Sequence, residues 1–274
     1  MLDAKLSQAS KLIDITNKIK RNIQNSRTKL LTITSGKGGV GKSTFTANIA
    51  FLLAQRNLKI AVLDADIGLA NMQVLFDIKP QCTLFEYVNG QKSLNEIILE
   101  TKYKNIFLVA GKSGYEYASG TNSFVFTRLI NDIISLNQFD ILVVDTGAGL
   151  NDYVKEFLSV SENILAITTT DPSALTDVYS LLKMLAIDKN SLMLCFNHTK
   201  NYQVGETITN SLSNLAKKNR LKEDFMIKYL GSISSSENIS VTGRLRKLFV
   251  NEFPVDEITK QMHRVVENIL KNIE

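Results

Sequence analysis

The ten residues from Ser35 to Thr44 read SGKGGVGKST, and this segment constrains the fold more than any other part of the chain. It satisfies the phosphate-binding loop pattern G-x4-G-K-[ST]. An apolar run at Leu30–Thr34 precedes the loop, and a helical pattern at Thr44–Gln55 follows it. A strand, this loop and a helix in that order form a nucleotide-binding unit, so the sequence predicts an α/β fold with a phosphate site at the turn.

The residue types in this loop have chemical properties that suit phosphate and metal binding. Glycines allow the backbone to bend tightly and to turn successive N–H groups toward an anion, and the helix N-terminus adds partial positive charge. We expect Lys42 to lie against the β- and γ-phosphates and Ser43 to offer its hydroxyl to Mg²⁺. The cofactors are therefore predicted to be ATP and Mg²⁺, and the predicted nucleotide-binding residues of the loop are Gly36, Lys37, Gly38, Gly39, Val40, Gly41, Lys42, Ser43 and Thr44.

Lys37 is a second lysine in a loop where one lysine already serves the bound phosphates. A residue at this point can project across a face-to-face dimer and touch the nucleotide of the other subunit. Charge supplied in trans by arginine fingers raises rates roughly 10³- to 10⁵-fold in other enzymes. We therefore predict a catalytic role for Lys37 in an ATP-dependent homodimer; the alternative is a solvated surface lysine.

Length and composition limit the class of protein. A chain of 274 residues with 44% hydrophobic content is long enough for one large α/β domain with a buried sheet. Cys82 and Cys195 are far apart and form no C-x-x-C unit, which speaks against a disulfide framework and against a zinc or iron–sulfur site. No signal peptide and no apolar run of membrane-spanning length is found. We expect a cytoplasmic protein.

The first 27 residues differ from the rest. They hold six basic and two acidic side chains, which is four of the five net positive charges of the chain, so the remaining body is nearly neutral. A nearly neutral body argues weakly against nonspecific DNA binding. Apolar residues recur in this segment at three- and four-residue spacing, which predicts an amphipathic helix that needs a partner surface. They are Leu2, Leu6, Ala9, Leu12, Ile15, Ile19 and Ile23.

Seven apolar runs beyond residue 27 are typical of strands, with helical patterns between most of them. Because these runs are nearly continuous rather than alternating, we predict a doubly wound, mostly parallel sheet with helices on both faces, forming one domain over residues 28–274. The runs are Leu30–Thr34, Leu58–Leu63, Ile106–Ala110, Phe139–Val144, Asn163–Thr168, Ser191–Phe196 and Met226–Leu230.

Acidic residues follow two of these strands, at the carboxyl ends where such sheets bind ligands. Asp145 and the glycines after it resemble a Walker B acid that continues into a switch, so Asp145 is predicted to hold Mg²⁺ through water. Asp64 and Asp66 lie two apart and are expected to face one side. We assign Asp66 to the attacking water and Asp64 to the magnesium, and the reverse order remains open.

Two further features carry predictions with alternatives. Asn197 follows a predicted strand, where its amide could recognise the adenine edge, or it is only a turn residue. Near the C-terminus, residues 244–250 combine basic and large apolar side chains and are a candidate membrane contact; a helix packed on the fold is equally expected. The apolar stripe from Ile258 to Ile273 is predicted to be the last helix of the sheet domain.

Three motifs together resemble one family. Residues 37–44 (KGGVGKST), 64–71 (DADIGLAN) and 145–149 (DTGAG) are similar to those of the deviant-Walker-A ATPases, the MinD/ParA group. The resemblance covers roughly residues 28–272. Within the group, residues 145–149, the segment 168–177 and the N-terminal helix are most similar to the FlhG-type regulators of flagellar number.

The resemblance implies a function and partners. FlhG-type proteins carry an N-terminal D-Q-A-x-x-L-R motif that engages the GTPase FlhF; Gln8, Ala9 and Leu12 match it here, whereas its first aspartate and last arginine are absent. It further implies slow, Mg²⁺-dependent ATP hydrolysis, an ATP-dependent dimer and peripheral inner-membrane association in the ATP state. A flagellar transcription activator and C-ring proteins are further implied partners.

Three other function classes remain as alternatives. A MinD-type division-site regulator and a ParA-type partitioning ATPase share the nucleotide motifs, although the near-neutral body makes nucleic acid an unexpected partner. A metabolic or metal-cluster relative is opposed by the missing cysteine pair.

Overall fold

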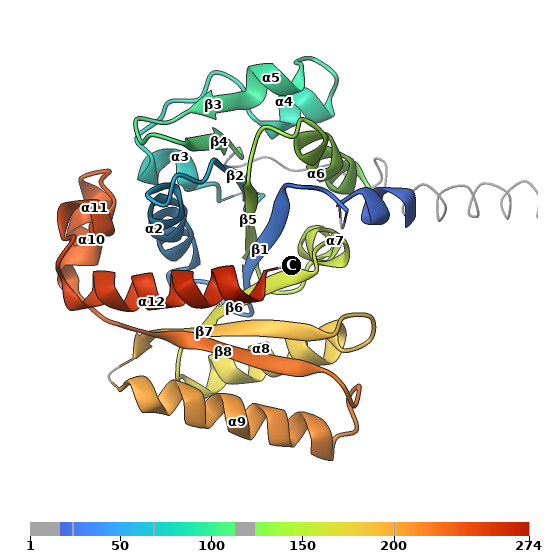
Figure 1. The fold of residues 1–274 in the computed structure, drawn as a ribbon, viewed down its shortest axis with the longest axis vertical. Coiled ribbons are helices and arrows are strands. Elements are labelled where there is room, and N and C mark those ends of the chain that lie inside the picture. Colours follow the sequence, from blue (N-terminus) through green and yellow to red (C-terminus); the bar gives the residue numbers. More distant parts are fainter. Residues whose placement is uncertain (1–16, 24, 68, 113–123, 200, 274) are drawn as a thin grey trace, which may run out of the picture.

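The computed structural model describes residues 17–273 except for residues 24, 68, 113–123 and 200. Its centre is an eight-stranded sheet with the order β3-β4-β2-β5-β1-β6-β7-β8, in which only the β3–β4 pair is antiparallel (Figure 1). The predicted mostly parallel sheet is therefore confirmed. The strands are β1 (Lys29–Ser35), β2 (Ile60–Ala65), β3 (Ile98–Glu100), β4 (Ile106–Val109), β5 (Ile141–Ala148), β6 (Asn163–Thr168), β7 (Ser191–Thr199) and β8 (Met226–Ser234).

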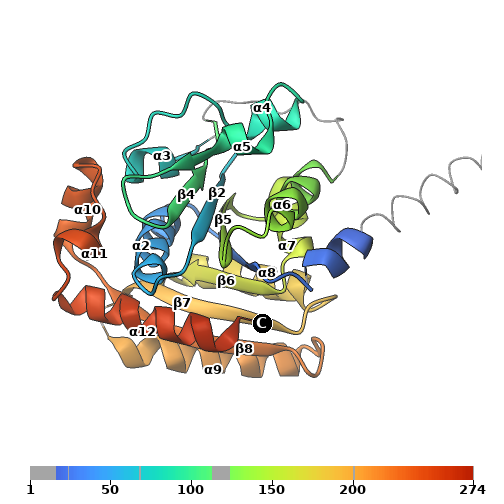
Figure 2. The same ribbon diagram turned by 45° about the horizontal axis from the view of Figure 1, so that its top comes forward.

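Helices cover both faces of this sheet, as Figures 1 and 2 show. Alternate residues of β1 divide between the two faces: Leu31 and Ile33 pack with α2 and α12, whereas Leu30 packs with α6. A third cluster joins α8 and α9 to β6 and β7. The helices are α2 (Lys42–Ala54), α3 (Met72–Leu75), α4 (Leu84–Val88), α5 (Leu94–Ile97), α6 (Val125–Ser135), α7 (Asp152–Val160), α8 (Pro172–Leu185), α9 (Tyr202–Lys218), α10 (Glu237–Arg244), α11 (Phe249–Glu252) and α12 (Glu257–Asn272).

The register of the central strands brings the acidic residues together. Asp64 of β2 pairs with Asp145 of β5, and Asp145 pairs with Ile33 of β1, two residues before β1 ends. The phosphate-binding loop continues from β1 into α2. The loop and the carboxylates therefore meet at one edge of the sheet, as the parallel arrangement requires.

The described end of the N-terminal segment is packed on the sheet domain. Residues 17–23 are helical, Ile23 is buried, and Ile19 packs against the same apolar cluster. The Asn22 side chain donates hydrogen bonds to Asn131 Oδ1 (2.7 Å) and Ser135 Oγ (3.2 Å) of α6. The predicted partner-binding residues Gln8, Ala9 and Leu12 lie outside the described residues.

The C-terminal stripe belongs to the domain core. Ile258, Met262, Val265, Val266 and Ile269 of α12 are buried against the sheet and α2, which confirms its prediction as the last helix.

The segment 244–250 is also largely packed on the fold. Leu248, Phe249 and Val250 are buried, and only Leu245 among its apolar residues is exposed. The packed alternative therefore describes this segment better than the membrane alternative. Within the part of the chain that the structure describes, no helix is both long and apolar enough to cross a membrane.

Candidate nucleotide site

The phosphate-binding loop surrounds a cavity of about 530 Å³ at the carboxyl edge of the sheet. Gly39 (φ 79°) and Gly41 (φ 84°) adopt left-handed backbone conformations that favour glycine, and Gly41 caps the start of α2. A loop of this kind with a helix N-terminus behind it is an anion site. The predicted phosphate ligands that line the cavity are Gly38, Gly39, Val40, Gly41, Lys42, Ser43 and Thr44.

Gly36 and Lys37 belong to the same loop but do not line this cavity. Gly36 lies so close to α8 that a β-carbon there would be 2.5 Å from Asp177 Cβ. Lys37 is exposed, and its Nζ donates a hydrogen bond to Ser173 Oγ of α8 at 2.9 Å. The two lysines of the loop therefore point to different places, one into the site and one away from it.

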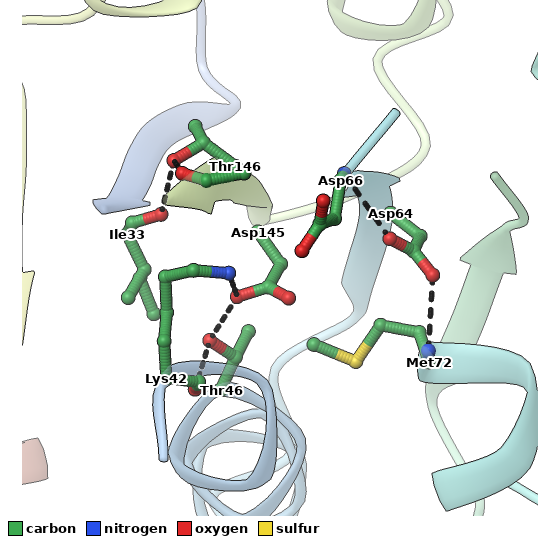
Figure 3. A network of polar contacts seen from close by, with 9 residues as sticks. Ile33, Lys42, Thr46, Asp64, Asp66, Met72, Asp145 and Thr146 are labelled. Carbon is green, nitrogen blue, oxygen red and sulfur yellow. Dashed lines mark hydrogen bonds and ion pairs between the residues drawn. The ribbon is translucent and has the colours of Figure 1, made fainter. Parts of the chain in front are cut away.

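Lys42 is buried, and its Nζ lies 3.0 Å from Asp145 Oδ1 (Figure 3). Thr46, one turn further along α2, donates to the same oxygen at 2.8 Å. The other carboxylate oxygen, Asp145 Oδ2, is buried and has no hydrogen-bond partner among the residues that the structure describes. A buried, unpartnered carboxylate oxygen at a phosphate-binding loop suits a magnesium site, because Mg²⁺ takes oxygen ligands and retains water.

Asp64 and Asp66 differ in position, because β2 ends between them at Ala65, and only Asp66 lines the cavity. Asp64 is fully buried; its Oδ2 accepts a hydrogen bond from Met72 N at 2.9 Å and its Oδ1 accepts one from Asp66 N at 3.3 Å. Asp66 is only half-buried and lines the cavity, and Figure 3 shows its carboxylate on the side of Asp145. A β-carbon on Gly147 would lie 3.3 Å from Asp66 Oδ1, so this glycine makes room for the carboxylate.

The two carboxyl groups also differ electrostatically. Burial, with the Asp145 carboxylate as the next cause, raises the pKa of Asp64 to about 7. Burial raises the pKa of Asp66 as well, while the charge of Lys42 opposes the shift. Of the two, Asp66 is the one placed to meet a ligand in the cavity, and Asp64 holds the start of α3. The magnesium role of Asp64 stays a prediction.

Asn197 lies beside the phosphate-binding loop, in the wall of a second cavity of about 310 Å³. Gly41 and Thr44 line both cavities, so the two adjoin. The Asn197 side-chain N–H donates to the Val40 carbonyl at 2.8 Å, so this group already supports the loop. Recognition of adenine by Asn197 stays a prediction; the Val40 contact uses one of its two side-chain N–H groups and leaves its side-chain oxygen out.

The sequence analysis did not select Thr46 or His198. Thr46 has a recognisable signal, because four residues after Lys42 on a helix places it on the same face. His198 lines the second cavity with a left-handed backbone (φ 56°), and its Nδ1 lies 3.3 Å from Ser235 Oγ. No sequence pattern predicts the left-handed backbone conformation of His198.

Comparison with known proteins agrees with this geometry. A family model described as "ParA: NUBPL iron-transfer P-loop NTPase" matches residues 26–270. The flagellum site-determining protein YlxH of Helicobacter pylori is 33% identical over 98% of this chain and 90% of its own length, and the antiactivator FleN of Pseudomonas aeruginosa is 28% identical over 88% and 86%. The septum site-determining protein MinD of Pyrococcus horikoshii, solved with Mg-ADP, superposes with a TM-score of 0.70 at 21% identity, covering 89% of this chain and 98% of its own.

The chain therefore belongs to the ParA family of P-loop NTPases, which includes the MinD/ParA ATPases. Within it, the chain is similar to the flagellar regulators YlxH and FleN over nearly its whole length. Among the described residues, no cluster of three or more His, Cys, Asp or Glu side chains suits a metal ion.

Proposed function

We propose that this protein is a switch ATPase that regulates flagellar number or placement, joining two copies when ATP and Mg²⁺ are bound. The names of YlxH and FleN support the flagellar role. The observation that carries the switch is the divergence of the two lysines: Lys42 is buried in the site, whereas Lys37 lies outside it and is exposed.

The residues around the cavity suit MgATP. Gly38 to Thr44 would hold the phosphates through backbone N–H groups, with Lys42 as the counter-charge. Ser43 and Asp145 would hold the metal, whose chemistry is to neutralise phosphate charge during transfer of the terminal phosphoryl group to water. Asp66 would orient that water, because its half-buried carboxylate reaches the cavity.

Lys37 would complete the site of the second copy. Lys37 does not line the cavity of its own chain, so its ammonium group is free to leave the exposed Ser173 contact when another subunit approaches. Such an exposed hydrogen bond contributes little stability and is easily exchanged. Hydrolysis then removes the shared contact and returns the protein to the monomer.

Dimerisation tests this proposal through light scattering with ATP, ADP and no nucleotide. Asp66→Ala is expected to remain dimeric with ATP, and Lys37→Ala is expected to remain monomeric. Ser173→Ala is the matched control: it removes the contact that Lys37 makes within its own chain but leaves the ammonium group, so it should still dimerise. A wild-type protein that is monomeric under all three conditions would refute the proposal.

The N-terminal segment is proposed to bind an FlhF-type GTPase through Gln8, Ala9 and Leu12, in a cytoplasmic protein with peripheral membrane contact. The contacts of Asn22 and Ile23 set the design of the test, because removing residues 1–27 would also remove packing on α6. Removal of residues 1–16 alone keeps that packing. Undiminished stimulation of GTP hydrolysis by this shorter protein would reject the idea.

A further inference from the structure

We infer that one end of the molecule, formed by the last turns of α8 and α9, the loops that follow them (residues 186–190 and 219–225) and the start of β8, binds the surface of an anionic lipid bilayer. We call it the amino-end surface, because β7 and β8 begin there. The inference rests on the peripheral membrane contact in the proposed function and names the surface that makes it.

Hydrogen bonds hold the three segments of this surface together. Asn219, at the end of α9, donates to the Tyr179 hydroxyl of α8. Lys222 donates to the Lys189 carbonyl at 3.3 Å, and Met226 N of β8 donates to the Asn190 carbonyl at 2.9 Å. The segments therefore form one continuous part of the folded domain.

The amino-end surface is basic. Three acidic residues lie in its segments, Asp188, Glu223 and Asp224, against five exposed basic residues: Lys183, Lys217, Lys218, Arg220 and Lys222. This excess of two positive charges is larger than the net charge of the whole body beyond residue 27, which is one. Lys222 is close to Asp224, at 3.9 Å, so the cluster around Lys217 and Lys218 supplies most of the attraction.

Large apolar side chains lie among these charges. Ile187 is 80% exposed, Met226 56% and Leu215 41%. Exposed apolar residues inside a basic cluster suit the boundary between lipid headgroups and acyl chains. A nucleic acid backbone would be attracted by the same charges but gives Ile187 and Met226 nothing apolar to contact, so the observations favour lipid.

The position of the surface fits this role. Parallel strands place the nucleotide cavity at their carboxyl ends, and the amino-end surface lies at their opposite ends. Figure 1 shows α9 and β8 together along one side of the sheet, away from α2. Contact with a bilayer here leaves the phosphate-binding loop open to a second copy of the chain.

Vesicle sedimentation tests the inference with the full chain. Phosphatidylglycerol vesicles, phosphatidylcholine vesicles and a duplex DNA are compared as probes. Lys217→Gln/Lys218→Gln is expected to lower partition onto phosphatidylglycerol roughly 25-fold, since each basic residue near an anionic surface contributes on the order of fivefold. Ile187→Ser is expected to lower it roughly fivefold through the lost apolar contact.

Two controls match these variants in charge and exposure elsewhere on the fold. Lys79→Gln/Lys104→Gln neutralises two other exposed lysines, and Val255→Ser removes an apolar side chain that is 82% exposed. Both should bind phosphatidylglycerol vesicles as the wild type does. All four variants retain the basic N-terminal segment, so any contribution from it cancels.

The outcomes separate this inference from the proposed function. Equal vesicle binding by the amino-end variants and their controls would overturn the inference. It would also be overturned if the protein binds duplex DNA and this binding is weakened by Lys217→Gln/Lys218→Gln but not by Ile187→Ser. The Lys37→Ala protein should still bind vesicles as a monomer, so vesicle binding can be observed even if dimerisation fails. Conversely, ATP-dependent dimers without these vesicle effects would leave the switch standing and refute the surface.

Discussion

Replacing Gly36 and Gly38 by alanine should affect the protein very differently, although both lie in the phosphate-binding loop. A β-carbon at Gly36 would lie 2.5 Å from Asp177 Cβ, 2.9 Å from the Asp177 carbonyl carbon and 3.1 Å from Val178 N. Two of these neighbours are backbone atoms of α8, so the helix or the loop must move. At Gly38 the nearest atom would be Ala148 Cβ at 4.0 Å, an ordinary contact.

The expected magnitudes follow from two terms. Overpacking of a close contact costs roughly 1–3 kcal/mol. Both substitutions reduce the entropy of the unfolded chain, which stabilises by about 0.4–1 kcal/mol where the backbone is compatible, and neither Gly36 nor Gly38 has a positive φ. That second term cancels between the variants, so Gly36→Ala should be less stable than Gly38→Ala by roughly 1–3 kcal/mol.

Thermal unfolding without nucleotide measures the difference. For domains near this size each kcal/mol shifts the midpoint by about 2–4 °C, so Gly36→Ala should melt roughly 2–12 °C below Gly38→Ala. Binding of a fluorescent ATP analogue should instead be changed by Gly38→Ala, because Gly38 lines the cavity. Equal midpoints, or a lower midpoint for Gly38→Ala, would refute the reasoning.

Two further predictions concern buried charge. Lys42→Ala should lower the free energy of unfolding, measured in urea without nucleotide, by roughly 3–5 kcal/mol, because the buried Asp145 carboxylate loses its cation. Replacement of the exposed Lys37 by alanine should leave this free energy unchanged. Equal urea midpoints for the two variants would contradict the prediction. Glu156 accepts hydrogen bonds from Phe126 N and Thr127 N at the start of α6, and burial raises its pKa above the usual 4.5. The folded state therefore holds this proton more tightly than the unfolded state, and the associated stability is lost as the pH rises from about 4.5 through the folded pKa. Glu156→Gln keeps an acceptor oxygen without the titration, so its stability relative to wild type should improve from pH 5 to pH 8; parallel pH profiles would rule this out.

Much of the fold could be predicted because its strands are buried on both faces and their sequences are continuously apolar. All seven predicted strands are present. The strand β3 was missed, because Ile98–Glu100 is only three residues long and directly follows the short helix α5, where local periodicity carries no information.

The site was predicted less completely, for a different physical reason. The phosphate-binding loop is a local motif, so seven of its nine predicted residues line the cavity, whereas Gly36 and Lys37 do not. The orientations of Asp64, Asp66 and Asn197 depend on where a strand ends and on what packs behind it. Asp64 turns toward Met72 N and Asn197 toward the Val40 carbonyl, and neither contact is visible in the spacing of the residues.

The two outer strands of the sheet limit how copies of this chain can accumulate. One outer strand, β3, has three residues; the other, β8, carries Lys228 and an irregular register opposite Leu194 and Cys195. Short strands, lysines and bulges all discourage strand-to-strand pairing between molecules. Many copies gathered at one place in a cell therefore meet no long, regular strand on which to template a fibre. The proposed association through the loop edge would then remain under the control of the nucleotide and be fully reversible.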